Sequence, residues 1–195
     1  MATLPAPLPV LRGSLVYLRA SERSDVDAFV RWFNDGETLR FVGMHDPLSV
    51  ALEERWFERM LESQGRDAYH FVICLRSDQR SIGTIGFFDI DPLNGSAEVG
   101  ITIGDKALWG KGYGTDAMNV LVDFGFGTLR LERIQLRVYD FNTRARRSYE
   151  KSGFVLEGTQ RHAAFKEGAY HDVQLMSLLR EEWAALDRPR SWEQP

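Results

Sequence analysis

Three glycines stand at alternate positions, Gly110, Gly112 and Gly114, in the stretch ALWGKGYGTDAM, just before a helical pattern begins. Glycine permits a positive φ angle and lets another group come close to the main chain. A glycine-rich turn that leads into the N-terminus of a helix also presents free N–H groups to an anion. The stretch therefore predicts either a tight strand-to-helix turn or a binding site for an anionic group such as a pyrophosphate.

Two common phosphate-binding motifs do not fit this stretch. A P-loop requires G-x-x-x-x-G-K-[ST], but Gly104 lies one residue too far before Gly110, and Lys111 is followed by a glycine. A dinucleotide-binding fingerprint requires G-x-G-x-x-G, but position 115 is a threonine. A role in anion binding therefore has to rest on a different motif.

Length and charge limit the classes of protein to consider. The 195 residues favour a single domain over residues 1–195, with a core at about 12–181 and flexible ends at about 1–10 and 187–195. The net charge of −4 lacks the basic excess that is typical of nucleic-acid binders. The N-terminus lacks the pattern of a secretory signal, and no apolar run approaches the ~20 residues of a membrane span. We therefore expect a cytoplasmic protein that binds neither nucleic acid nor membrane.

The periodicity of apolar residues predicts an α/β (α+β) fold with the order β–α–α–β–β–β–α–β–α–β–β. The central sheet is expected to be mixed, mostly antiparallel and flanked by helices. In the second predicted helix, Leu52, Trp56 and Met60 share a face. The predicted elements are a strand at 14–20, a helix from about Val26, a helix within 46–65, strands at 68–76, 81–90 and 97–104, a helix after the glycines, a strand at 133–140, a helix at 142–153, and strands at 154–161 and 170–179.

The helix that follows the glycines carries an apolar stripe formed by Ala117, Val120, Leu121 and Phe124. Glycine inside a helix costs about 1 kcal/mol relative to alanine. We therefore expect this helix to end at Gly125 and Gly127.

Two motifs together resemble a known superfamily. The stretch WGKGYGTDAM, followed about 25 residues later by NTRARRSYEKSGF, resembles the GNAT superfamily of acyl-CoA-dependent N-acyltransferases. The resemblance covers about residues 12–181 and is strongest to the branch of ribosomal-protein N-terminal acetyltransferases and spermidine acetyltransferases. The phosphate loop of that family has the form [QR]-x-x-G-x-[GA]. Gly112 and Gly114 match its glycines, whereas Trp109 replaces Gln or Arg.

The resemblance implies a binding site for acetyl-CoA as cosubstrate. The glycine loop would cradle the pyrophosphate, the strand at 97–104 would pair with the pantetheine arm, and Asn142 would contact the coenzyme. Without the resemblance, a helix N-cap is the preferred reading of Asn142. The residues expected to bind the coenzyme are Val99, Gly100, Ile101, Trp109, Gly110, Lys111, Gly112, Tyr113, Gly114, Thr115, Asn142 and Arg147.

Two residues are candidates for the proton transfers. Tyr149 matches the tyrosine that lies at the thioester sulfur in many relatives, and a phenol with a pKa near ~10 can protonate a leaving thiolate. Its alternative role is core packing. Glu98 lies on the strand expected to line the thioester, where a carboxylate can deprotonate an amine directly or through water. Its alternative role is an ion pair with a neighbouring basic residue.

Other titratable residues are weaker candidates for a role in catalysis or in binding the acceptor. His171 and Asp172 lie where relatives close the acceptor pocket, although Asp172 reads better as a hydrogen-bonding residue of the sheet. Cys74 is the one cysteine, which excludes an intramolecular disulfide. It reads as a buried strand residue rather than an acylated nucleophile, so we expect direct transfer. No residue spacing indicates a metal site.

Two clusters of charge have open roles. Arg144, Arg146, Arg147 and Lys151 are either a solvated helix face or an attraction for the 3′-phospho-ADP end of the coenzyme. An acidic group lies in the N-terminal helical region, which forms part of the acceptor cleft in relatives and would suit a cationic amine. Scattered surface acids are the default reading of this group, which comprises Asp35, Glu37, Glu53, Glu54 and Glu58.

These observations predict an N-acetyltransferase that moves acetyl from acetyl-CoA to a primary amine in a ternary complex. The first acceptor predicted is the α-amine of a peptide or protein N-terminus, and a polyamine or another small amine is the alternative. A non-catalytic acyl-CoA-binding sensor is the alternative of a different class. The acyl group and the oligomeric state, including a homodimer, are left open.

Overall fold

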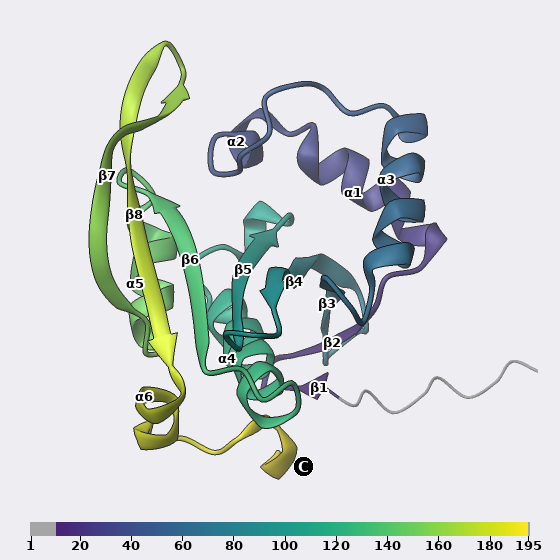
Figure 1. Ribbon diagram of the computed structural model, residues 1–195. Coiled ribbons are helices and arrows are strands. Elements are labelled where there is room, and N and C mark those ends of the chain that lie inside the picture. Colours follow the sequence, from purple (N-terminus) through teal and green to yellow (C-terminus); the bar gives the residue numbers. More distant parts are fainter. Residues whose placement is uncertain (1–10, 195) are drawn as a thin grey trace, which may run out of the picture.

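The computed structural model describes residues 11–194 and places eight strands in one sheet (Figure 1). The order across the sheet is β1-β2-β3-β4-β5-β6-β8-β7. Neighbouring strands are antiparallel except for β5 and β6, which are parallel. Residues 1–10, expected to form a flexible end, lie outside the described residues.

The elements follow the predicted order, and the predicted mixed, mostly antiparallel fold is confirmed. The additions are β1, α2, α6 and short 3₁₀ turns. In the first half the bounds are β1 Leu11–Arg12, β2 Val16–Ala20, α1 Val26–Phe33, α2 Gly36–Leu39, α3 Val50–Ser63, β3 Tyr69–Leu75, β4 Ser81–Asp91 and β5 Ser96–Ile103. In the second half they are α4 Tyr113–Gly127, β6 Arg133–Tyr139, α5 Thr143–Lys151, β7 Val155–Lys166, β8 Ala169–Leu179 and α6 Arg180–Ala185.

Helices cover both faces of the sheet because β3 is apolar on both sides. Phe71, Ile73 and Leu75 belong to the main core, which also includes the buried face of α4. Val72 and Cys74 face the other way and pack with Phe29 of α1. The sheet is therefore the middle layer, and α4 lies on the opposite face from α1.

The predicted end of α4 is wrong by one glycine. The helix runs through Gly125 to Gly127. A Cβ atom on Gly125 would lie 2.7 Å from Cζ of Phe87 and 2.9 Å from Cδ1 of Ile134. Gly125 is therefore required for close packing on the sheet and does not stop the helix.

The predicted buried face of α3 is also shifted. Leu52 is 50% exposed, whereas Glu53 is 5% exposed and lies on the same face as Phe57 and Met60. Burial raises the pKa of Glu53. The apolar spacing alone fits either face, and packing against α1 selects the one that contains the carboxyl group.

The divergence of β5 from β6 creates the space for a site. The two strands pair only over Ser96–Glu98 and Arg133–Gln135. β5 continues to Ile103 and β6 to Tyr139. Among the described residues, the edge of β5 that faces β6 therefore has no strand partner after Glu98.

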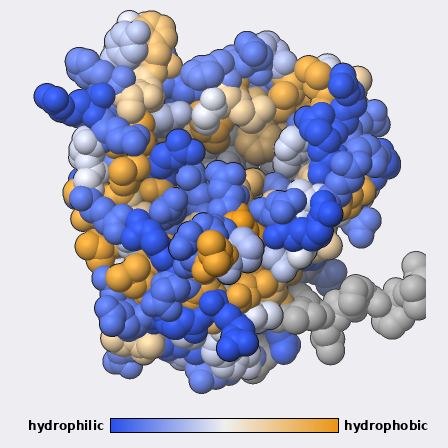
Figure 2. Space-filling view, viewed as in Figure 1, coloured by the Kyte–Doolittle hydropathy of each residue, from blue (hydrophilic) through white to orange (hydrophobic). Residues whose placement is uncertain are grey.

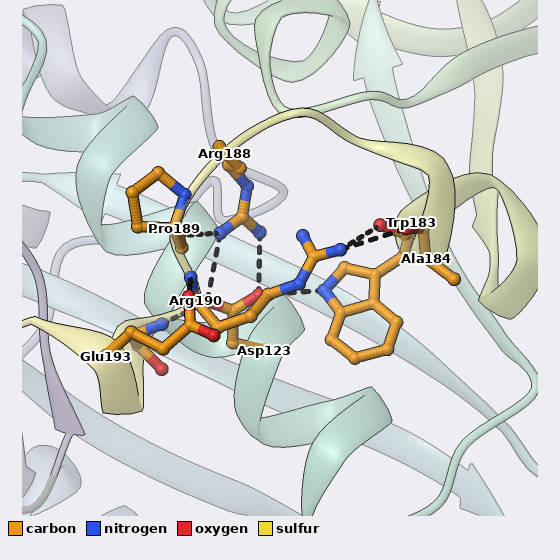
Figure 3. Close-up of polar contacts among 8 residues, drawn as sticks. Asp123, Trp183, Ala184, Arg188, Pro189, Arg190 and Glu193 are labelled. Atoms are coloured by element: carbon orange, nitrogen blue, oxygen red, sulfur yellow. Dashed lines mark hydrogen bonds and ion pairs between the residues drawn. The ribbon is translucent and has the colours of Figure 1, made fainter.

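The C-terminal segment is not the loose end that we expected. Asp123 of α4 is fully buried and accepts hydrogen bonds from Arg188 at 2.7 and 2.9 Å, from Nε1 of Trp183 at 2.7 Å and from the backbone N–H of Ser191 at 2.7 Å (Figure 3). Residues 188–194 are thus tied to α4, while residue 195 lies outside the described residues. The periodicity of the sequence could not predict these hydrogen bonds, because the partners of Asp123 lie some sixty residues later in the chain.

No helix among residues 11–194 is long and apolar enough to cross a membrane.

Asp123→Ala should destabilise the fold strongly, because it leaves the Trp183 indole N–H without an acceptor and the Arg188 guanidinium without its carboxylate partner. We expect a loss of about 3–5 kcal/mol in the free energy of unfolding, the usual result of removing one partner of a buried pair. Urea unfolding measures it, with Asp187→Ala on the exposed side of the same segment as control. Equal stability of the two variants would contradict a tethering role for Asp123.

Candidate active site

A cleft opens where β5 and β6 diverge, and it has a volume of about 400 Å³. We call it the loop cleft because the glycine loop, residues 109–115, forms one wall. β5, α5 and the segment 38–42 form the other walls. The predicted coenzyme-binding residues that line it are Ile101, Trp109, Gly110, Gly112, Gly114, Thr115, Asn142 and Arg147.

The glycine loop has the backbone that its sequence predicts. Gly110 and Gly112 have φ angles of 74° and 91°, a region that residues with a Cβ rarely adopt. Gly112 is the N-cap of the 15-residue helix α4. The first N–H groups of a helix lack intrahelical acceptors, and the helix dipole is positive at that end. The loop therefore offers main-chain donors and positive potential to an anion such as a pyrophosphate.

Gly114 serves a different purpose from the other two glycines. It lies inside the first turn of α4, and no positive φ is recorded for it. A Cβ atom there would lie 3.7 Å from Ile103 and 3.9 Å from Ile101, which are ordinary contacts. No protein atom therefore prevents a side chain at Gly114, and the space that such a side chain would occupy is part of the loop cleft.

Trp109 connects the glycine loop to strand β5 of the sheet. Its Nε1–H donates to the Ile103 carbonyl oxygen at 2.6 Å. The Arg144 guanidinium lies 3.8 Å from the centre of the Trp109 ring, and burial lowers the pKa of Arg144. A cation from α5 therefore lies beside the residue that replaces Gln or Arg of the family pattern.

Four of the predicted coenzyme-binding residues do not line the loop cleft: Val99, Gly100, Lys111 and Tyr113. Val99 and Tyr113 turn toward the core. A Cβ on Gly100 would meet the Phe88 ring at 2.9 Å, so this glycine also accommodates packing within the sheet. The expected pairing of pantetheine with the main chain of β5 depends on its free edge and not on these side chains.

A second cavity, of about 460 Å³, adjoins the first. We call it the hairpin cavity because Ala163, Ala164 and Phe165 of the β7–β8 hairpin form one wall. Figure 2 shows the surface hollowed between this hairpin and the N-terminal helices. Phe41, Asn142 and Tyr149 line both cavities. The cavities therefore share a wall.

Tyr149 lies in this shared wall with its ring packed against the core. Burial raises the pKa of Tyr149 to about 12. The phenol is therefore protonated at neutral pH and has a donor to offer to a bound molecule.

Glu98 lies at the point of divergence and lines the hairpin cavity. Its side chain is 22% exposed, and its Oε1 accepts a hydrogen bond from Nε of Arg137 at 3.0 Å. The ion pair that we considered as the alternative role is thus present. A role as general base stays a prediction.

Asn142 forms the N-cap that its position suggests. Its Oδ1 accepts from the Ala145 N–H at 3.2 Å, and the residue is buried. The residue also lines both cavities. Capping and a coenzyme contact are therefore compatible in geometry.

The remaining candidates have structural roles. Asp172 accepts a hydrogen bond from the His162 N–H at 2.9 Å, as a sheet residue would. His171 lies 3.8 Å from Asp140. Cys74 is buried in β3, and burial raises its pKa, which does not suit a nucleophile. No group of three or more His, Cys, Asp or Glu residues in the described part of the chain could hold a metal ion.

The acidic group in the N-terminal helices is not a free cation site. Asp35 and Glu37 both form ion pairs with Lys106, at 2.9 and 3.2 Å. Glu58 pairs with Arg23, and Glu53 is buried. None of the five residues lines either cavity. The default reading of this group as scattered surface acids therefore fits better than an acidic acceptor cleft.

No pattern in the sequence indicated several of the residues that line the two cavities. Phe41 and His45 lie in an irregular segment between α2 and α3, and Phe165 lies on an exposed hairpin. They meet only because the two segments fold toward each other, so no spacing along the chain could indicate them.

A family model described as the acetyltransferase (GNAT) domain matches residues 16–155. The chain belongs to this family. It is 32% identical over 169 residues to the uncharacterized N-acetyltransferase p20 of Bacillus licheniformis, covering 86% of this chain and 94% of p20. It is 30% identical over 173 residues to a spermidine N(1)-acetyltransferase of Vibrio cholerae, covering 88% and 96%.

Solved structures agree with this assignment. The crystal structure of spermidine N-acetyltransferase from Vibrio cholerae in complex with CoA and spermine superposes with a TM-score of 0.80 at 27% identity. The match covers 87% of this chain and 98% of that one. The GNAT chain described here is thus an N-acetyltransferase, a class that takes its acetyl group from acetyl-CoA, and the predicted enzyme class and cosubstrate are confirmed.

The Gly114→Ala variant tests whether the coenzyme fills the space at the glycine loop. The unliganded variant should be at least as stable as the wild type, because alanine is a better helix former than glycine by about 0.8–1 kcal/mol. The rise in melting temperature with acetyl-CoA should fall sharply, because the methyl group occupies the ligand's space. Thermal unfolding with and without acetyl-CoA measures both effects.

Gly158→Ala on β7, where a Cβ meets nothing within 4 Å, is the matched control. If acetyl-CoA stabilised the Gly114 variant as much as the control, the glycine loop would lie outside the binding site.

Proposed function

We propose that this chain transfers the acetyl group of acetyl-CoA directly to a primary amine, with the coenzyme in the loop cleft and the amine in the hairpin cavity. The observation that carries the proposal is the wall shared by the two cavities, formed by Phe41, Asn142 and Tyr149. Two substrates bound in adjoining cavities that share these residues are close enough together for a direct transfer.

The residues of the loop cleft fit the coenzyme. The free edge of β5 offers main-chain groups to the amides of the pantetheine arm. The N-terminus of α4 offers donors to the pyrophosphate. Arg147 and Lys151 line the same cleft one and two turns along α5, where they suit further phosphate charge.

The chemistry needs proton transfers at the amine and at the leaving thiolate. The ammonium form of the amine loses a proton to Glu98, directly or through water, and its lone pair attacks the thioester carbonyl. The C–N bond forms, the tetrahedral intermediate collapses, and the C–S bond breaks. The coenzyme thiolate takes the proton of the Tyr149 hydroxyl, and the proton that the attacking nitrogen sheds as the amide forms returns the Tyr149 phenolate to a phenol. Burial keeps this phenol protonated at neutral pH, because it raises the pKa of Tyr149 to about 12.

A polyamine or a related small amine is the first acceptor to consider. The support comes from relatives: a spermidine N(1)-acetyltransferase matches over most of both chains, and the superposed crystal structure holds spermine. This reverses the order of preference suggested by the sequence, which placed a peptide α-amine first.

The α-amine of a peptide is kept as the second candidate because of one feature of the cavity. Glu98 is the one acidic residue among its lining residues, and it is paired with Arg137. A single carboxylate suits one amino group better than the several charges of a polyamine. An α-amine, with a pKa of about 7.7 against about 10.4 for an alkylamine, is also easier to deprotonate.

Tyr149→Phe tests the general acid. The variant keeps the ring and its packing but loses the proton, so kcat should fall by roughly 10²-fold or more. The KM for acetyl-CoA should change little, since ground-state binding is retained. Steady-state release of free thiol measures both constants, and an unchanged kcat would leave Tyr149 as a packing residue.

A panel of amines tests the acceptor, with release of free thiol from acetyl-CoA as the readout. It contains spermidine, spermine, an aminoglycoside, and one peptide with its N-terminus either free or acetylated. We expect the highest kcat/KM with the polyamines and no release with the acetylated peptide. Release with the free peptide and none with polyamines would promote the second candidate. Binding of acetyl-CoA without release by any amine would favour a sensor and contradict the proposed enzyme.

A further inference from the structure

Lys166 is a buried cation that has no role in the proposed transfer reaction. It is the last residue of β7 and is 7% exposed. Burial lowers its pKa. No ion pair of residues 11–194 includes it, whereas buried lysines usually have a carboxylate partner. A cation in this position is costly unless its hydrogen bonds serve the fold.

The hydrogen bonds of Lys166 go to the main chain of a distant segment. Its Nζ donates to the Met44 carbonyl oxygen at 2.8 Å and to the Leu39 carbonyl oxygen at 3.3 Å. Both acceptors belong to what we call the cavity loop, residues 39–45, which connects the end of α2 to the approach to α3 and is almost entirely irregular. One ammonium group thus satisfies two carbonyl oxygens of a segment with little secondary structure of its own.

The cavity loop is held at two places. At its base, the side chain of Asn34 exchanges two hydrogen bonds with the main chain of Leu48, at 2.7 and 2.8 Å. Toward its tip it meets the sheet through Lys166 and through the Tyr139 hydroxyl, which lies 3.4 Å from the Val42 carbonyl oxygen. The bond from Lys166 to Met44 is the shortest of these tip hydrogen bonds. Both bonds from Lys166 have a charged donor, and charge-assisted bonds are the stronger kind.

The two segments that Lys166 joins are two walls of the hairpin cavity. Phe41, Gly43 and His45 of the cavity loop line one side. Ala164 and Phe165, directly before Lys166, line another. Lys166 therefore joins these two walls, although it does not itself line the cavity.

We propose that Lys166 is a positioning residue for the acceptor, whose ammonium group holds the cavity loop against the β7–β8 hairpin and so shapes the hairpin cavity. The proposal rests on the proposed function, since it assigns that cavity to the amine. It predicts that loss of Lys166 affects the amine more than acetyl-CoA, because the hairpin lines only the hairpin cavity and the loop cleft is formed mainly by the glycine loop, β5 and α5.

Lys166→Met is the test variant, because it keeps the length of the side chain and removes its charge and donors. Two buried carbonyl oxygens then lose their partner, which costs enough to open the loop in part of the population. We expect the KM for the accepted amine to rise about tenfold or more. The KM for acetyl-CoA and the stabilisation by acetyl-CoA should stay within about twofold of the wild type.

Limited trypsin digestion gives a readout that does not depend on any amine. Release of the cavity loop should speed cleavage after Arg40 by about tenfold, since proteases act on locally opened chain. Glu167→Gln is the matched control. It removes the neighbouring ion pair between Arg40 and Glu167, at 3.1 Å, which joins the same two segments but is exposed and therefore contributes little. Lys166→Arg, which keeps a cationic donor, should restore much of the wild-type behaviour.

Equal changes in both KM values, or an unchanged amine KM with unchanged cleavage, would overturn the proposal. If Lys166→Met does not fold, Lys166→Gln supplies the same comparison. If no amine is accepted by the wild type, the proposed function fails, and the rate of cleavage after Arg40 still decides whether Lys166 holds the loop.

Discussion

The short parallel pairing of β5 with β6 is the constraint on which the site depends. Three residues of each strand pair and then the strands separate, at Glu98 and Gln135. A sheet edge inside a fold would normally leave polar main-chain groups without partners, which is costly. Here the edge lines a cleft, so a ligand with amide groups can complete it. The same divergence brings the N-terminus of α4 and the side of α5 to a common opening.

Two carboxylates of α4 bind segments that are far away in the sequence. Asp116, in the first turn of α4, accepts backbone N–H bonds from Ser14, Leu15 and Val16 at 2.8–3.0 Å, and so ties the N-terminal strand to the glycine loop. Asp123, two turns further along, ties down the C-terminal segment. α4 is therefore fixed at two points by chain that is far away in sequence. The rigidity of its N-terminus matters, because a site built from main-chain donors works only if those donors do not move.

Periodicity predicted the strands and helices well because it reports burial on one face of an element. The inward residues of β6, Ile134, Leu136 and Val138, are all buried. Periodicity failed where two faces fit equally well, as for Leu52 and Glu53 of α3. It also failed at Gly125, where the reason for a glycine is a neighbouring ring and not the local backbone. Such contacts depend on packing, which the pattern of one element does not contain.

The sequence by itself determined the glycine loop, the N-cap at Asn142 and the placement of Tyr149 on the following helix, because these depend on residue type and short spacing. Tertiary structure alone decided that the acidic N-terminal residues pair with Lys106 and Arg23, and that Glu98 meets Arg137. It also decided that Lys166 reaches the loop before α3, 122 positions away. The physical reason is that charge pairing depends on distance in space, and residues so far apart in the chain are brought within hydrogen-bonding distance only when the whole sheet has formed.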